Sequence, residues 1–95
     1  MTEEAKGPLT RTVTVVNPQG LHARPAHMVV LTANRFPCRI EVVRGDLEVD
    51  AKSIMSLMML AAEKGTELLL RAEGPEAAEA LEALVALFAS GFKEG

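Results

Sequence analysis

The sequence predicts an α+β fold, a two-layer sandwich in which helices cover one face of a sheet. The chain has 95 residues, a length that suits one small domain with its own core. Segments with strand-like and helical periodicity occur in the order strand, helix, strand, strand, helix, strand, helix. Strands that bury only one face need a covering layer, and the predicted helices supply it.

The first half of the chain predicts a strand, a helix and a hairpin. In residues 9–16, valines alternate with threonines, which is the pattern of a strand with one buried face. In residues 23–35, apolar side chains recur at helical spacing, and the helix is expected to stop before the Phe-Pro pair that follows. Strands 39–44 and 47–50 come next, joined by Gly45–Asp46, which is typical of a two-residue hairpin turn.

The second half predicts a short helix, a further strand and a long helix. The short helix is expected over 53–62, with Gly65 as its left-handed cap. Residues 66–72 are the strand, and the long helix is expected over 75–90, with proline and glutamate suited to its start. Its apolar face consists of Leu81, Leu84, Val85 and Phe88.

One domain is expected over residues 8–92, with a short leader at 1–7 and a tail at 93–95. The formal net charge of −3 argues against general affinity for nucleic acid, which depends mainly on lysine and arginine. Neither a cleavable signal nor a membrane-spanning run is found, and Cys38, the single cysteine, cannot form an internal disulfide. We therefore expect a cytoplasmic monomer that binds no nucleic acid and does not insert into a membrane.

The stretch GLHARPAH, residues 20–27, contains both histidines of the chain. If the helix opens at Ala23, His22 occupies the cap position, where backbone N–H groups lack intrahelical partners. Those N–H groups and the positive end of the helix dipole attract phosphate, and the guanidinium of Arg24 can pair with phosphate oxygens. Pro25 is tolerated in the first turn because its missing N–H has no helical acceptor there.

These residues predict a histidine that accepts a phosphoryl group. Phosphoryl transfer needs mainly alignment and positive charge, so such a site is expected to work without a metal or a cofactor. Two plainer interpretations remain open: a solvated cap histidine, or a site where His22 and Arg24 hold phosphate reversibly. His27 lies five residues after His22, which turns the two rings apart around the helix. A shared metal is therefore not expected, and we interpret His27 as structural or solvent-facing.

The segment SIMSLMML, residues 53–60, carries more apolar surface than one face of a short helix can bury. About half of its apolar side chains are expected in the core, and the rest on a surface that docks partners, for which flexible methionines are well suited. The candidate docking residues are Ile54, Met55 and Met58. Ser53, at the start of this helix, is from its position alone an N-cap.

The motifs GLHARPA, AKSIMSLMML and KGTELLLRAEG, with the Ala/Leu-rich final helix, resemble the HPr family over residues 8–92. This family comprises the histidine-containing phosphocarriers of the bacterial phosphoenolpyruvate:sugar phosphotransferase system. The resemblance implies an open-faced β-sandwich, with a four-stranded antiparallel sheet covered on one side by three helices. It also implies that His22 is phosphorylated on Nδ1, that Arg24 pairs with the phosphate, and that Ser53 is a regulatory serine modified by an ATP-dependent kinase.

By this resemblance the chain is a phosphoryl carrier and not itself an enzyme. It would take a phosphoryl group on His22 from enzyme I, which phosphoenolpyruvate charges, and pass it to sugar-specific enzyme II A domains. The alternative is a regulatory HPr-like module, whose phosphorylation state is read by an HPr kinase/phosphorylase, a transcriptional regulator or a metabolic enzyme without sugar uptake. Lys52 keeps a positive charge where the family often carries lysine, and it is taken as a further partner-binding residue.

Overall fold

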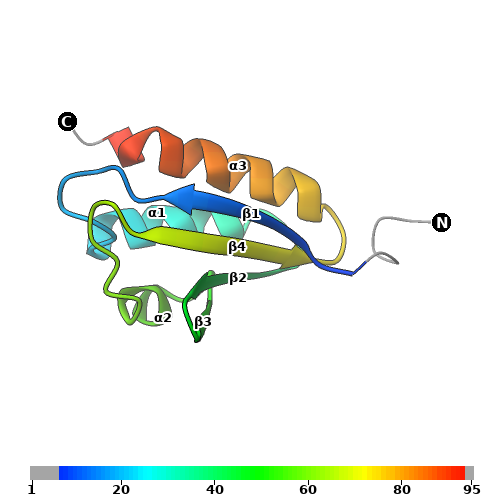
Figure 1. The fold of residues 1–95 in the computed structure, drawn as a ribbon. Coiled ribbons are helices and arrows are strands. Elements are labelled where there is room, and N and C mark those ends of the chain that lie inside the picture. Colours follow the sequence, from blue (N-terminus) through cyan, green and yellow to red (C-terminus); the bar gives the residue numbers. More distant parts are fainter. Residues whose placement is uncertain (1–6, 94–95) are drawn as a thin grey trace.

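The computed structural model describes residues 7–93, and its elements follow the predicted order (Figure 1). They are β1 (Leu9–Thr14), α1 (Ala23–Ala33), β2 (Arg39–Arg44), β3 (Leu47–Asp50), α2 (Ile54–Met58), β4 (Glu67–Glu73), α3 (Ala77–Ala89) and a short 3-10 turn at Gly91–Lys93. The predicted leader lies outside the described residues except for Gly7, as do residues 94 and 95 of the predicted tail. Across the described range, the helices are all too short or too polar to cross a lipid bilayer.

The sheet has the strand order β1-β4-β2-β3, and every neighbouring pair of strands is antiparallel. One face of the sheet is buried, because Val13, Val42 and Leu70 are each at most 7% exposed. The side chains that alternate with them, such as Thr12 and Glu41, lie on the opposite face and are exposed or partly exposed. The predicted α+β class and the open-faced sandwich are therefore confirmed.

The buried face of the sheet packs against α3 at β1 and β4, and α1 packs against α3 and α2; Figure 1 shows α1 and α3 running along the strands. The predicted helical spacing of apolar side chains is confirmed in α1, where Ala26, Val29 and Ala33 are buried and Val30 is partly buried. The predicted apolar face of α3 is confirmed too, although Val85 is only partly buried. The ring of Phe88 meets that of Phe92 edge to face, with centroids 5.0 Å apart and planes at 72°. This geometry is favourable for aromatic pairs and closes the end of the core where α3 terminates. The fully buried helical side chains are Ala26, Val29, Ala33, Leu57, Ala80, Leu81, Leu84 and Phe88.

The predicted hairpin is confirmed with its predicted bounds. Arg44, the last residue of β2, pairs with Leu47, the first residue of β3, which leaves Gly45 and Asp46 as the two-residue turn. Gly45 has a φ of 58°, the left-handed conformation that hairpin turns of this length require. The turn is therefore specified locally by the residue types in it.

The second helix is shorter than predicted. It was expected over 53–62, but α2 ends at Met58, and the prediction that Gly65 caps it is wrong. Gly65 lies farther along, in a turn, and its N–H donates to the carbonyl of Val15 at 2.7 Å. The left-handed residue that ends this helical region is Ala61, with a φ of 50°.

The early end of α2 has a physical reason in the contacts of the next residues. The carbonyls of Leu60 and Ala61 accept hydrogen bonds from the guanidinium of Arg44, at 2.7 and 2.9 Å. The carbonyl of Ala62 accepts from the N–H of Leu21 at 2.8 Å. These partners from other parts of the chain replace the helical hydrogen bonds that a longer helix would make.

The last helix begins at Ala77, two residues after the predicted start at Pro75. Glu76 is its N-cap and has a left-handed conformation with a φ of 64°. The N–H of Ala77 donates to the carbonyl of Gly74 at 3.3 Å, so Pro75 and Glu76 form a turn that redirects the chain from β4 into α3. Because α3 packs on the sheet that contains β4, the chain must reverse sharply between them. Pro75 and Glu76, which were predicted as the start of the helix, form this reversal.

An ion-pair network ties three strands together on the open face of the sheet. Arg71 of β4 lies directly opposite Glu41 of β2, and its Nη2 and Nε donate to Oε1 of Glu41 at 2.7 and 3.1 Å. The same Nη2 donates to Oε1 of Glu48 on β3 at 2.7 Å. Arg39 adds a contact of 3.2 Å to the second oxygen of Glu41. The hydrogen bonds from Arg71 hold the pKa of Glu41 below its ordinary value of 4.5, against the opposing effect of burial.

We expect Glu41→Gln to lower stability at neutral pH but not in acid. A carboxyl whose pKa is depressed in the folded state stabilises the fold above the unfolded pKa, and loses this contribution as the pH falls through the folded pKa. Because Glu41 titrates below 4.5 in the folded protein, the loss on substitution should be about 1 kcal/mol at pH 7 and close to zero near pH 2. Urea denaturation of the wild type and the variant at each pH measures the loss in the free energy of unfolding.

The matched control is Glu67→Gln, which removes a carboxylate from the exposed start of β4. It should change the free energy of unfolding much less than Glu41→Gln at pH 7. A stability difference for Glu41→Gln that persisted unchanged at pH 2 would show that its effect does not come from the charge of the carboxylate.

Candidate functional site

His22 is the N-cap of α1, as the sequence predicts. Its backbone is extended, with φ −82° and ψ −170°, and its carbonyl accepts the first helical hydrogen bond, from the N–H of Ala26 at 2.9 Å. His22 is partly buried, whereas Pro25 is buried in the first turn. The N–H groups in the first turn of a helix have no carbonyl within the helix to donate to, and they form the positive end of the helix dipole. As the N-cap of the eleven-residue helix α1, His22 lies at this positive end.

The loop that leads into His22 is a tight turn over Asn17–Gly20. The N–H of Gly20 donates to the carbonyl of Asn17 at 3.2 Å, and the side-chain Nδ2 of Asn17 donates to the carbonyl of Gly20 at 2.6 Å. Asn17 is only 1% exposed. A buried amide that bonds back to its own turn fixes the backbone just before the catalytic candidate, a role that the sequence analysis did not identify.

The same loop lies against the chain that follows α2. The N–H of Leu21 donates to the carbonyl of Ala62 at 2.8 Å. Gly20 has a φ of 74°, and a Cβ atom on it would lie 2.5 Å from the carbonyl oxygen of Ala62 and 2.9 Å from the Cα of Glu63. Only glycine allows the two backbones to approach this closely. His22 is thereby held next to the end of α2, although the two are far apart in the sequence.

A groove of about 250 Å³ lies between the two segments, and His22 forms part of its wall. The predicted phosphoryl acceptor and part of the predicted docking surface, Met58, therefore line the same groove. Arg24, at the second position of α1, is exposed and has the reach to contact an anion at the helix start. His27 is exposed on the same helix. The lining residues of the groove are Gln19, Leu21, His22, Met58, Ala61, Ala62 and Glu63.

Comparison with known proteins identifies the family. A family model described as the PTS HPr component phosphorylation site matches residues 9–90. The chain belongs to the HPr phosphocarrier family. Its relatives include the phosphocarrier protein HPr of Pseudomonas putida, 49% identical over 90% of this chain and 96% of that protein. Another is the phosphocarrier protein NPr of Escherichia coli, 40% identical over 88% of this chain and 94% of that protein.

A solved structure has the same fold. The crystal structure of HPr-C-His from Thermoanaerobacter tengcongensis superposes with a TM-score of 0.88 and 42% sequence identity, covering 92% of this chain and 98% of the other. The resemblance seen in the sequence is therefore confirmed, and a general role as a phosphocarrier follows from the family. Proteins of this kind carry phosphoryl groups and are not enzymes themselves.

Four of the seven large apolar side chains that are exposed in the described residues lie on α2 and at its end; the other three are Val16, Leu31 and Leu47. We call Ile54, Met55, Met58 and Met59 the α2 surface; their exposed fractions are 37%, 80%, 43% and 66%. The expectation that about half of the apolar side chains of this segment enter the core is too high for residues 54–59, because among them only Leu57 is fully buried. A helix of five residues presents one narrow face to α1, so the other side chains face outward.

Ser53 is the N-cap of α2, as its position predicts. Its Oγ accepts a hydrogen bond from the N–H of Ser56 at 3.2 Å, and its own N–H donates to the carbonyl of Asp50 at 3.2 Å. Its phosphorylation stays a prediction. The side chain is partly exposed and directly precedes Ile54, so a group added to it would lie at the border of the α2 surface.

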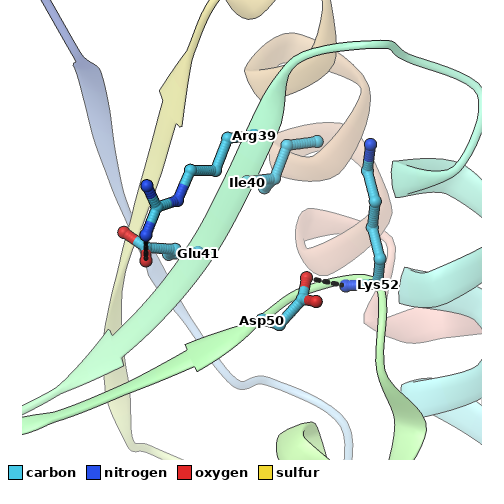
Figure 2. Close-up of a pocket in the computed structure, with 5 residues that line it drawn as sticks. All are labelled: Arg39, Ile40, Glu41, Asp50 and Lys52. Carbon is cyan, nitrogen blue, oxygen red and sulfur yellow. Dashed lines mark hydrogen bonds and ion pairs between the residues drawn. The ribbon is translucent and has the colours of Figure 1, made fainter.

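Lys52 has a geometry that the sequence analysis did not foresee. Its Nζ donates to the carbonyls of Phe36 and Cys38, at 2.8 and 2.9 Å, and so fastens the chain after α1 to the chain after β3. Its N–H donates to Oδ1 of Asp50 at 2.8 Å (Figure 2). A partner-binding role for Lys52 stays a prediction, and two of the hydrogen bonds available to its ammonium group are already used inside the fold. Lys52 lines a groove of about 280 Å³ together with Arg39, Ile40, Glu41 and Asp50. Figure 2 shows how these five side chains lie.

Cys38 lies under the Lys52 contact and is buried. Burial raises the pKa of its thiol, and the nearby charge of Lys52 offsets this only in part. A buried thiol with a raised pKa is a weak nucleophile, so Cys38 serves packing. In the described part of the chain, no three histidine, cysteine or acidic side chains are grouped as a metal site would require.

We expect Gly20→Ala to destabilise the domain much more than Gly45→Ala. Both glycines have a positive φ, 74° and 58°, so both substitutions cost about 1 kcal/mol of backbone strain. A Cβ at Gly45 would meet nothing within 4 Å, whereas one at Gly20 would collide with the backbone of Ala62 and Glu63. Gly20→Ala should therefore cost about 3 kcal/mol in total, measured by urea denaturation. Equal losses for the two variants would contradict the close approach.

Proposed function

We propose that this protein accepts a phosphoryl group on His22 from enzyme I, charged by phosphoenolpyruvate, and passes it to sugar-specific enzyme II A domains. The observation that carries the proposal is the position of His22, at the start of α1 and in the wall of the groove that Met58 of the α2 surface also lines. A partner seated on the α2 surface would have its reacting group within reach of the imidazole. Membership of the HPr family supports the same role.

Phosphoryl transfer to His22 requires few catalytic groups from the carrier protein. The imidazole Nδ1 attacks the phosphorus held by enzyme I, and the bond from phosphorus to the donor breaks as the new N–P bond forms. No electrons are gained or lost, so no redox partner is needed. The arriving dianion is stabilised by the N–H groups at the start of α1 and by the guanidinium of Arg24. Because the transition state of phosphoryl transfer is loose, alignment and positive charge are sufficient catalytic help.

The α2 surface fits a protein that must dock several partners in turn. Three of its four residues are methionines, which adapt their shape to different partners. Met55 is 80% exposed, so its side chain contributes little to the packing of the domain itself and is available to a partner. We therefore assign to this surface, with Ile54, Met55 and Met58 at its centre, the contacts with enzyme I and the enzyme II A domains.

The second candidate function is regulatory. In it, partners such as a kinase/phosphorylase, a transcriptional regulator or a metabolic enzyme read the phosphorylation state without sugar uptake. The observations that favour it are the position of Ser53 beside the α2 surface and the presence of a phosphocarrier named NPr, besides HPr, among the relatives. Both candidate functions require that His22 can be modified, and the partner is what separates them.

The first test is phosphorylation by enzyme I and phosphoenolpyruvate, followed by intact-mass analysis. We expect the wild-type protein to gain one acid-labile, base-stable phosphoryl group, because an N–P bond hydrolyses once the ring is protonated. His22→Ala should gain none. His27→Ala, which removes the exposed histidine five residues later, is the matched control and should be labelled normally. Labelling of His22→Ala at the wild-type level would refute the proposal, and the absence of any covalent label on the wild type would favour reversible phosphate binding.

The second test concerns Ser53. Phosphoserine introduced at position 53 should weaken docking of enzyme I by about 1–3 kcal/mol, because a dianion beside Ile54 and Met55 must be desolvated in the interface. The melting temperature should hold or rise slightly, since the phosphate oxygens can still accept from the N–H of Ser56.

Phosphoserine at position 90, after the end of α3, serves as the matched control for the added charge. It should leave the affinity for enzyme I near the wild-type value. Equal affinities for the proteins modified at 53 and at 90 would contradict the docking surface assigned to α2, and a large fall in melting temperature at 53 alone would contradict the tolerance of the α2 start for the phosphate.

A further inference from the structure

Arg44 connects the end of strand β2 to the end of helix α2. Its Nη1 donates to the carbonyl of Leu60 at 2.7 Å and to the carbonyl of Ala61 at 2.9 Å. Both carbonyls come just after Met59, the C-cap of α2. The guanidinium therefore satisfies backbone acceptors at the point where the helical hydrogen bonds run out.

A helix as short as α2 depends on contacts from outside itself. It has five residues, and isolated helices of this length are not stable in water. At its start Ser53 supplies the cap, and at its end the N–H groups of Leu60 and Ala61 turn back to the carbonyls of Leu57 and Met58, both at 3.1 Å. The carbonyls of Leu60 and Ala61 accept from Arg44 instead of from a further helical turn, and a cation near the end of a helix is favourable to its dipole.

Ala61 takes a conformation that alanine disfavours. Its φ of 50° lies in the left-handed region, which is unfavourable for a residue that carries a Cβ. This conformation reverses the chain, so that the carbonyl of Ala62 can accept from the N–H of Leu21 at 2.8 Å. The hydrogen bond from Arg44 to the carbonyl of Ala61 holds the strained residue in place.

We propose that Arg44 is a positioning residue for partner docking. By fixing Leu60 and Ala61, it sets the orientation of the α2 surface and of the wall of the His22 groove formed by Met58, Ala61, Ala62 and Glu63. Arg44 does not line that groove, so it acts through the backbone that it holds. The functional part of this inference rests on the proposed phosphocarrier function, whereas the positioning of the backbone does not.

The first measurement is independent of function. Hydrogen exchange of the Leu21 amide, whose N–H donates to Ala62, reports on whether the two segments stay together. In Arg44→Ala this amide should exchange about tenfold faster than in the wild type, because the backbone at 60–62 opens locally. Arg39→Ala, the same substitution at the other end of β2 on a side chain that is 74% exposed, is the matched control and should leave Leu21 unchanged.

The second measurement is the rate of phosphorylation by enzyme I as a function of carrier concentration. Arg44→Ala should raise KM severalfold while kcat stays near the wild-type value, because docking is impaired and the chemistry at His22 is not. Arg44→Lys keeps the positive charge but has a single donor nitrogen, so its KM should lie between those of the wild type and Arg44→Ala. In the Ala61→Gly background, where the left-handed conformation is unstrained, the effect of Arg44→Ala should shrink.

The outcomes separate the two proposals. If wild-type protein is not phosphorylated, the proposed function fails, and the exchange of Leu21 still decides whether Arg44 positions the backbone. If Leu21 exchanges at the same rate in Arg44→Ala and Arg39→Ala, the positioning role is overturned. If Leu21 exchanges faster but KM is unchanged, Arg44 supports stability alone and its role in docking is overturned. A melting temperature of Arg44→Ala well above the assay temperature ensures that these readings come from folded protein.

Discussion

The backbone contact between Gly20–Leu21 and Ala62–Glu63 is the constraint on which the rest of the site depends. It brings the start of α1, which holds His22, against the chain that leaves α2, and it does so through main-chain atoms. Main-chain contacts vary little with side-chain motion. The fold itself therefore sets the distance between His22 and the opposite wall of the groove, which Met58, Ala61, Ala62 and Glu63 form. The tight turn at Asn17 supports the contact from one side, and Arg44 supports it from the other.

The short helix α2 shows how a surface can be both apolar and ordered. Exposed methionine side chains contribute little to the stability of the fold, and a five-residue helix contributes little stability of its own. Its order comes from three points of attachment: the cap at Ser53, the buried side chain of Leu57 and the guanidinium of Arg44. The adaptable side chains therefore project from a backbone that is fixed, which is the arrangement that a surface for several partners needs.

The features that the sequence predicts well are those set by neighbouring residues. The hairpin at Gly45–Asp46, the alternation in the strands and the cap at His22 all follow from local residue types, and all are confirmed. The end of α2 could not be predicted, because it is decided by Arg44 and Leu21, which contact it from distant parts of the chain. The contacts of Lys52 were missed for the same reason, since its acceptors are backbone carbonyls that carry no signal in the sequence.

The sparseness of the site bears on how a carrier can release what it accepts. A phosphate held by many cations would be stable on His22 but slow to leave, whereas the start of α1 and the exposed Arg24 offer limited stabilisation near solvent. In the proposed function, each partner must then complete the site with its own charges when it docks. Under this proposal transfer occurs only while the two proteins are together, so selectivity would depend on the α2 surface more than on the histidine. Under the proposed functions of His22 and Arg44, the geometry at His22 decides what chemistry is possible, and the backbone held by Arg44 and Gly20 decides which partners can reach it.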